Sequence, residues 1–145
     1  MRLSRFSDIC LRALMYLGAH PDRVVSTLEM SGKLFVSREH LMKCLQTLSD
    51  LDLVEGVRGR GGGFRLTGDG GEIRLGDLVR KTEPTLAMAE CFEPVSTCPL
   101  TGNCRLAGVL AESQKAFFET MDRYTLGDLL AADRETLVQL EVSNG

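Results

Sequence analysis

Apolar residues recur every three or four positions along the first twenty residues of the chain. This spacing is typical of one buried helix face, and it predicts an amphipathic helix over residues 4–19 that ends near Gly18 and Pro21. The residues on that face are Phe6, Ile9, Cys10, Ala13, Leu14 and Leu17. Cys10 is therefore predicted to be a small core residue, because free cysteine is among the most buried residue types. Asp8 lies off the face, where its simplest role is an exposed ion pair with Arg12.

Two further segments begin with helix-capping residues and continue with apolar ones. Ser26 and Glu29 form a capping box that opens a short second helix, in which we expect Leu28 and Leu34 to face inward. Ser37 is the expected N-cap of a third helix. The core stripe of this third helix consists of Leu41, Cys44, Leu45 and Leu48. Two helices joined by so short a turn predict a helix-turn-helix.

Hydrogen-bond donors gather at the start of the third helix, on the face opposite its core stripe. They are Ser37, Arg38, His40 and Lys43. The second helix of a helix-turn-helix lies in the major groove of DNA, with its N-terminal residues at the base edges. A single histidine here is typical of a solvated surface, so the prediction depends on the cluster, which offers donors to phosphates and bases.

A β-hairpin is expected next, with strands at residues 53–57 and 64–67. The loop RGRGGG between them, residues 58–63, is not a dinucleotide-binding loop, because such a loop opens a helix and this one leads into a strand. Its arginines, Arg58 and Arg60, suit a wing that inserts into a narrow minor groove. The alternative is a basic hairpin without a role in binding.

The second half of the chain is expected to be helical. A short helix around Leu75, Leu78 and Val79 should end at Pro84, and Thr125 should cap a last short helix, with disorder from Glu141 onward. Between them, a helix of about eighteen residues has a broad apolar seam, too broad for a solvated surface. Its predicted dimerisation residues are Leu106, Leu110, Phe117 and Met121. The competing interpretation is a helix packed into the chain's own core.

These elements predict a mainly α fold with a small β-hairpin. We expect a winged helix-turn-helix domain at residues 1–84, a cysteine loop at 85–104, the dimerisation helix and last short helix at 105–132, and a tail at 133–145. The charge is divided between the halves: residues 1–67 carry ten Lys and Arg against seven Asp and Glu (+3), and residues 68–145 carry seven against thirteen (−6). A basic partner surface therefore belongs to the first half.

Three cysteines lie within fourteen residues, at Cys91, Cys98 and Cys104, separated by loop-forming residues. No apolar run is long enough to span a membrane and no signal peptide begins the chain, so we expect a cytoplasmic protein whose thiols stay reduced. Thiolates converging from such a loop can bind one metal centre, and Cys104 at a helix start would gain from the helix dipole. The alternatives are unliganded cysteines, with or without a disulfide, and a structural zinc site in a constitutive DNA-binding protein. The third alternative is an electron carrier or a thiol enzyme. Neither histidine lies near the loop in sequence and no Cys-x-x-Cys motif is present, which argues against a thiol enzyme.

The order of elements resembles the winged-helix iron-sulfur regulators that include NsrR, IscR and RirA. Several segments are most similar to the NsrR branch, which senses nitric oxide. These segments are RLSRFSD (2–8), LRAL (11–14), IRLGD (73–77), CRL (104–106) and YTLGDL (124–129). IscR-type proteins carry a histidine three residues after the last cysteine, and this chain has Ala107 there. The resemblance therefore disfavours the IscR branch.

The resemblance implies that Cys91, Cys98 and Cys104 bind an iron-sulfur cluster, with Asp8 of the other subunit as the fourth ligand. It also implies a homodimer that represses transcription from a palindromic operator and releases that DNA when nitric oxide modifies the cluster. A [4Fe-4S] cluster is favoured and a [2Fe-2S] cluster is the alternative. Sensing of iron or of redox state is the alternative to sensing of nitric oxide. On this basis the protein is not an enzyme.

Overall fold

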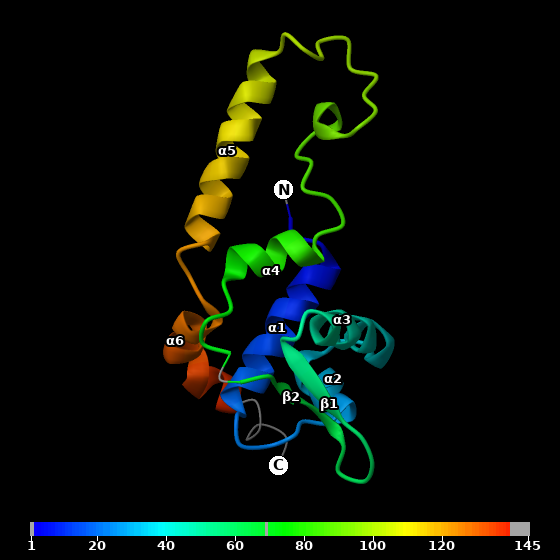
Figure 1. Cartoon of the computed structure of the whole chain (residues 1–145), viewed down its shortest axis with the longest axis vertical. Helices are drawn as coiled ribbons and strands as arrows, with labels where there is room; N and C mark the ends of the chain where they lie inside the picture. Colours follow the sequence, from blue (N-terminus) through cyan, green and yellow to red (C-terminus); the bar gives the residue numbers. More distant parts are fainter. Residues whose placement is uncertain (1, 69, 140–145) are drawn as a thin grey trace.

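Helix α1 (Arg5–Ala19) runs through the middle of the molecule, where it contacts most of the other elements. Figure 1 shows a computed structural model that describes residues 2–68 and 70–139. Ser4 caps α1, since its Oγ accepts a hydrogen bond of 3.1 Å from the backbone N–H of Ser7. The predicted stripe faces the core: its residues from Ile9 to Leu17 are buried, and Phe6 packs against them.

Helices α2 (Thr27–Leu34) and α3 (Arg38–Asp50) form the predicted helix-turn-helix. Both predicted caps are confirmed: Ser26 Oγ accepts from Glu29 N (3.1 Å), and Ser37 Oγ accepts from His40 N (3.3 Å). The four core positions predicted for α3 are all buried.

One core prediction for α2 is wrong. The side chain of Leu28 is 67% exposed, and Met30 takes the buried place beside Leu34. The physical reason is angular. At about 100° per residue, Leu28 and Leu34 lie about 120° apart around the helix and cannot share a narrow face.

Strands β1 (Val54–Val57) and β2 (Gly63–Leu66) pair antiparallel, with Val54 opposite Leu66 and Val57 opposite Gly63. The hairpin is joined to the helices through Val25, whose backbone exchanges two hydrogen bonds of 2.8 Å with Phe64. Glycine is required at residue 63, because a Cβ there would lie 2.1 Å from the carbonyl oxygen of Val25. The predicted wing is thus a hairpin fixed at its base, with a glycine-rich tip.

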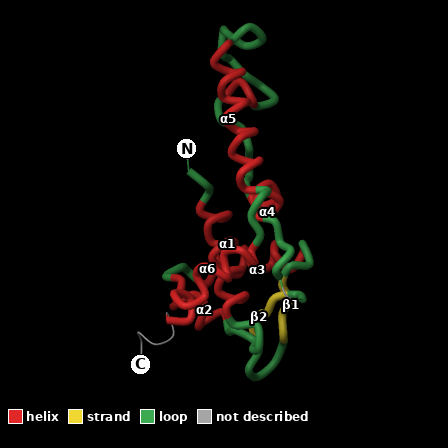
Figure 2. Tube along the Cα trace, turned by 90° about the vertical axis from the view of Figure 1, so that its left-hand side faces the viewer, coloured by secondary structure: helices red, strands yellow, loops and turns green. Residues whose placement is uncertain are grey.

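The remaining elements are α4 (Leu75–Thr82), the short 3-10 helix η1 (Glu90–Phe92), α5 (Arg105–Met121) and α6 (Leu126–Gln139). Figures 1 and 2 show α5 and the loop before it extending away from the other helices. Helix α6 packs against α1. The predicted cap of α6 at Thr125 is confirmed, but α6 is longer than expected and passes residue 132. The predicted disorder from Glu141 lies outside the described residues.

The mainly α fold with one β-hairpin is confirmed. Within the described parts of the chain, no helix is both long enough and apolar enough to cross a membrane.

Phe35 ends α2 in the left-handed backbone region, with φ of 52°, and its side chain is 87% exposed. This region disfavours bulky side chains, and little packing compensates for it. Phe35→Gly is therefore expected to raise the free energy of unfolding by about 1 kcal/mol, measurable by urea denaturation. Asp52→Gly, at the other end of α3 with φ of 58°, should give a smaller gain, because aspartate tolerates this region better. A Phe35→Gly variant that is less stable than the parent would contradict this account.

Candidate functional site

The start of α3 presents the predicted donor cluster to solvent. Ser37, Arg38, His40 and Lys43 are all exposed. Ser37 Oγ lies 2.6 Å from His40 Nδ1, so the capping residue also orients the imidazole. This surface is available to a partner because the opposite face of α3 is the one that packs into the core.

Glu39 was not among the predicted site residues, yet it lies within the donor cluster. Its Oε1 accepts a hydrogen bond of 2.9 Å from Lys43 Nζ, one helical turn away. That bond and the charge of Lys43 lower the pKa of the Glu39 carboxyl group, so it is ionised at neutral pH. The spacing of four residues between an acidic and a basic side chain was the available sequence signal. The cluster therefore contains an acceptor as well as donors.

The tip of the hairpin carries Arg58 and Arg60, both exposed. Among the described residues, neither guanidinium forms a hydrogen bond or an ion pair with another side chain. Arg65 differs, because its Nε donates to Glu55 Oε1 at 2.6 Å across the strands. The two tip arginines are therefore free to contact an anion.

The three loop cysteines lie between α4 and α5, in a connecting segment that Figure 1 shows extending to the end of the molecule opposite the hairpin. Cys91 is in η1, Cys98 lies in the following turn, and Cys104 is the N-cap residue of α5. Each is half-buried and has a free thiol. Gly102 has φ of 98°, a conformation that glycine adopts freely, and it lets the chain turn back toward α5.

Hydrogen bonds within the loop fix the backbone around Cys98. Glu90 Oε1 accepts from Thr97 N (2.6 Å) and Thr97 Oγ1 (2.7 Å), which ties the segments next to Cys91 and Cys98 together. These two bonds lower the pKa of the Glu90 carboxyl group. Cys98 N donates to Ser96 Oγ at 3.2 Å. The loop is thus locally ordered by these hydrogen bonds, none of which involves a cysteine sulfur.

The predicted ligands are not all brought together in a single chain. Across residues 2–68 and 70–139, no three His, Cys, Asp or Glu side chains are close enough to hold a metal ion. Asp8 lies on α1 and forms an ion pair of 2.6 Å with Arg12, as the sequence predicted. The donor set nevertheless fits an iron centre chemically, because three unbonded thiols lie on one turning loop. In this conformation the three cysteines and Asp8 do not by themselves form a metal site.

Cys10 and Cys44 are buried side by side in the core, as the sequence predicted. Their mutual hydrogen bond and their burial raise the pKa of the Cys10 thiol. Cys10 therefore stays protonated and is unsuited to metal binding.

Helix α5 has no buried residue, although all of its residues are described. Among the predicted dimerisation residues, Leu106 is 62% exposed, whereas Leu110, Phe117 and Met121 are half-buried. Val109, in the same seam, is 58% exposed. The first half of α5 thus presents apolar side chains that the single chain does not cover.

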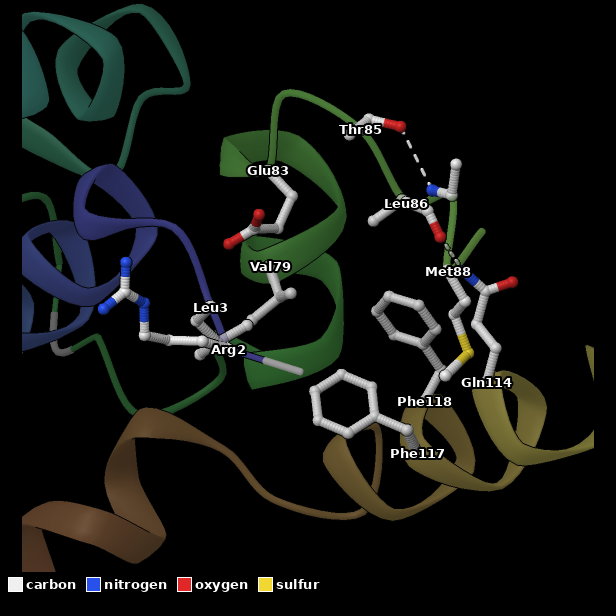
Figure 3. A pocket seen from close by; sticks show the side chains of 11 residues that line it. Arg2, Leu3, Val79, Glu83, Thr85, Leu86, Met88, Gln114, Phe117 and Phe118 are labelled. Atoms are coloured by element: carbon white, nitrogen blue, oxygen red, sulfur yellow. Dashed lines mark hydrogen bonds between the residues drawn. The ribbon is translucent and has the colours of Figure 1, made fainter. Parts of the chain in front are cut away.

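The second half of α5 contacts its own subunit. Phe117 and Phe118 line a cavity of about 490 Å³ between the N-terminal segment, α4 and the chain that follows α4 (Figure 3). Arg80 on α4 lies 4.3 Å from the ring centre of Phe118 and forms two hydrogen bonds of 2.7 Å with Asp122. These contacts attach the C-terminal end of α5 to α4.

Comparison with known proteins connects these features. The family described as Rrf2, iron-dependent transcriptional regulator, matches residues 3–132. The chain is 42% identical over 133 residues to Protein aau3 of Rhizobium meliloti, covering 91% of this chain and 86% of that protein. It is 37% identical over 142 residues to the HTH-type transcriptional regulator NsrR of Bacillus subtilis, covering 97% of each.

Among solved structures, T. potens IscR superposes with a TM-score of 0.74 at 23% sequence identity, covering 94% of this chain and 90% of that one. This likeness supports the winged helix-turn-helix fold. Because the family match spans most of the chain and the relatives exceed 30% identity over nearly all of it, the protein belongs to the Rrf2 family of transcriptional regulators.

Proposed function

We propose that this regulator is an iron-sulfur protein that represses transcription and leaves its operator when nitric oxide modifies the cluster. As a member of its family, it is a DNA-binding transcriptional regulator and not an enzyme. The observation that carries the proposal is the set of three free, half-buried thiols in the loop that leads into α5, in a chain whose relatives include proteins named NsrR. It acts where the DNA is, in the cytoplasm.

The DNA-binding surface consists of the exposed start of α3 and the hairpin tip. Helix α3 enters the major groove with Ser37, Arg38, His40 and Lys43 at the base edges and phosphates. The unpaired Arg58 and Arg60 enter the adjacent minor groove, whose negative potential attracts arginine when the groove is narrow.

Arg58→Ala is expected to weaken operator binding by about tenfold, because it removes a cation that no carboxylate pairs with among the described residues. The slope of log affinity against log salt concentration should fall by about one unit. Fluorescence anisotropy across a salt series measures both quantities. Arg65→Ala is the matched control on the same hairpin, since Arg65 is already paired with Glu55. Unchanged affinity and slope in Arg58→Ala would remove the hairpin tip from the interface.

Two copies of the chain form the DNA-binding unit, joined along α5. The support for this is the exposed apolar surface of Leu106 and Val109, on a helix too poorly buried to be stable alone. The cluster ligands are Cys91, Cys98 and Cys104, with Asp8 contributed by the second copy. Asp8 suits that role because its side chain is exposed at the start of α1.

A [4Fe-4S] cluster is favoured, with [2Fe-2S] as the alternative. When bound, it supplies an iron that a carboxylate holds less firmly than a thiolate would and that a small diatomic molecule can reach. The protein's part is to couple that ligation to DNA binding. Cys91, Cys98 and Cys104, when ligated, would fix the loop that leads into α5, and α5 sets the spacing of the two α3 helices. Without that ligation the loop would be free and the spacing of the α3 helices would change.

Anaerobic purification tests the proposal. We expect a brown protein that contains iron and sulfide, whose gel-shifted operator complex disappears as nitric oxide bleaches the visible band. A colourless protein with stoichiometric zinc would support a structural zinc site instead. A protein that keeps its operator affinity after bleaching would not be a nitric-oxide sensor, and iron or redox state would then be the signal to test.

A further inference from the structure

A carboxylate on a DNA-facing helix has an electrostatic disadvantage. Glu39 lies in the first turn of α3, between Arg38 and His40, and its side chain is 76% exposed. Its negative charge repels the phosphate backbone and weakens binding to duplexes of any sequence. Such a residue improves recognition only where it accepts a hydrogen bond from a base, and cytosine N4 is the donor that carboxylates read in the major groove.

Lys43 places a donor next to this acceptor. Its Nζ lies 2.9 Å from Glu39 Oε1, and both side chains are largely exposed. A C·G base pair presents the complementary arrangement on its major-groove edge, where the cytosine N4 donor is hydrogen-bonded to the guanine O6 acceptor at about 2.9 Å. The Glu39 acceptor and the Lys43 donor are therefore as far apart as the cytosine N4 donor and the guanine O6 acceptor that they would contact.

We propose that Glu39 and Lys43 act as a unit that reads one C·G base pair in each half-site. The Glu39 carboxylate accepts from cytosine N4, and the Lys43 ammonium donates to guanine O6 or N7. This inference rests on the proposed binding of operator DNA. In the free protein the ion pair holds the Glu39 carboxylate and the Lys43 ammonium against each other, so the two groups are oriented before DNA arrives.

A purely structural role for the pair makes a different prediction. An acidic residue in the first helical turn and an ion pair spanning four residues both support a helix, and their loss would affect stability alone. Base reading instead requires that Glu39→Gln change sequence preference. It also requires that this variant bind random duplexes more tightly, because one repulsive charge is removed.

The experiment begins with selection of preferred duplexes from a randomised pool by the parent protein. We expect enrichment of C·G at one position of each half-site, and an affinity about tenfold lower when T·A replaces it. Glu39→Gln should bind both duplexes about equally and should bind unselected duplexes more tightly than the parent. Lys43→Gln should also lose the preference, with weaker binding and a smaller salt slope.

Asp50→Asn is the matched control. Asp50 lies at the other end of α3, exposed and hydrogen-bonded only to Gln46 among the described residues, so the variant makes the same change in charge on the same helix. It should keep the parent's preference for C·G. If Glu39→Gln keeps the full tenfold preference, the inference is overturned while DNA binding stands. If the parent enriches no sequence at all, the proposed operator recognition fails, and the inference fails with it.

Discussion

Alanine at any one of Cys91, Cys98 or Cys104 is expected to abolish cluster assembly and leave a colourless protein that no longer responds to nitric oxide. The three thiols lie in one turning loop, free and half-buried, where thiolates can converge on iron. Removing one leaves too few thiolates to hold the metal. Visible absorption with iron and sulfide analysis after anaerobic reconstitution measures the effect.

Cys10→Ala and Cys44→Ala are the controls for this series. Both thiols are buried in the core, and Cys44 also lies 3.6 Å from the carbonyl oxygen of Phe6. Their loss should reduce stability and leave the visible spectrum intact. Asp8→Ala should give an intermediate result, a cluster that assembles but reacts at a different rate with nitric oxide. Full assembly in any of the three loop variants would show that its cysteine is not a ligand.

Val109→Asp is expected to weaken dimerisation at least a hundredfold and, with it, operator binding. Val109 is 58% exposed in the single chain, so aspartate there is tolerated by the monomer. In a two-fold symmetric interface the substitution occurs twice, and each unpaired carboxylate loses its hydration, at several kcal/mol. Analytical ultracentrifugation measures the change in oligomeric state.

Leu28→Asp provides the comparison for Val109→Asp. Leu28 is also an exposed apolar residue, 67% accessible against 58% for Val109, but it lies on α2 rather than α5. Its variant should keep the oligomeric state of the parent. If Val109→Asp dimerises with the same subunit affinity as the parent, α5 is not the dimer interface.

The helices that carry their own start signals were predictable from sequence. Ser26, Ser37 and Thr125 each cap the helix expected of them, because a capping hydrogen bond involves residues only three positions apart. The error at Leu28 arose on a helix of eight residues, where two apolar positions do not define a face. The sequence shows that Gly63 ends a glycine-rich stretch. It does not show why glycine is required there, because the close approach of Gly63 to Val25 depends on tertiary structure.

The sequence indicates candidate site residues where the proposed chemistry is local, and not where it depends on assembly of two copies. The clustering of Cys91, Cys98 and Cys104 in sequence is itself the signal of a shared role. Asp8 has no such signal, because its proposed contact lies in a second copy and its ion pair with Arg12 explains it within the single chain. Glu39 was overlooked because an acidic residue argues against DNA binding until its pairing with Lys43 is seen.

The attachment of α5 to α4 through Arg80, Phe118 and Asp122 has a mechanical consequence. The C-terminal end of α5 is fixed to α4, and the N-terminal end of the same helix follows the cysteine loop. Seventeen helical residues span about 25 Å at about 1.5 Å per residue, so a tilt of about 5° at the fixed end displaces the far end by about 2 Å. In the opposite direction, a shift of this size in the loop would produce a small rotation of α4, which packs against α1.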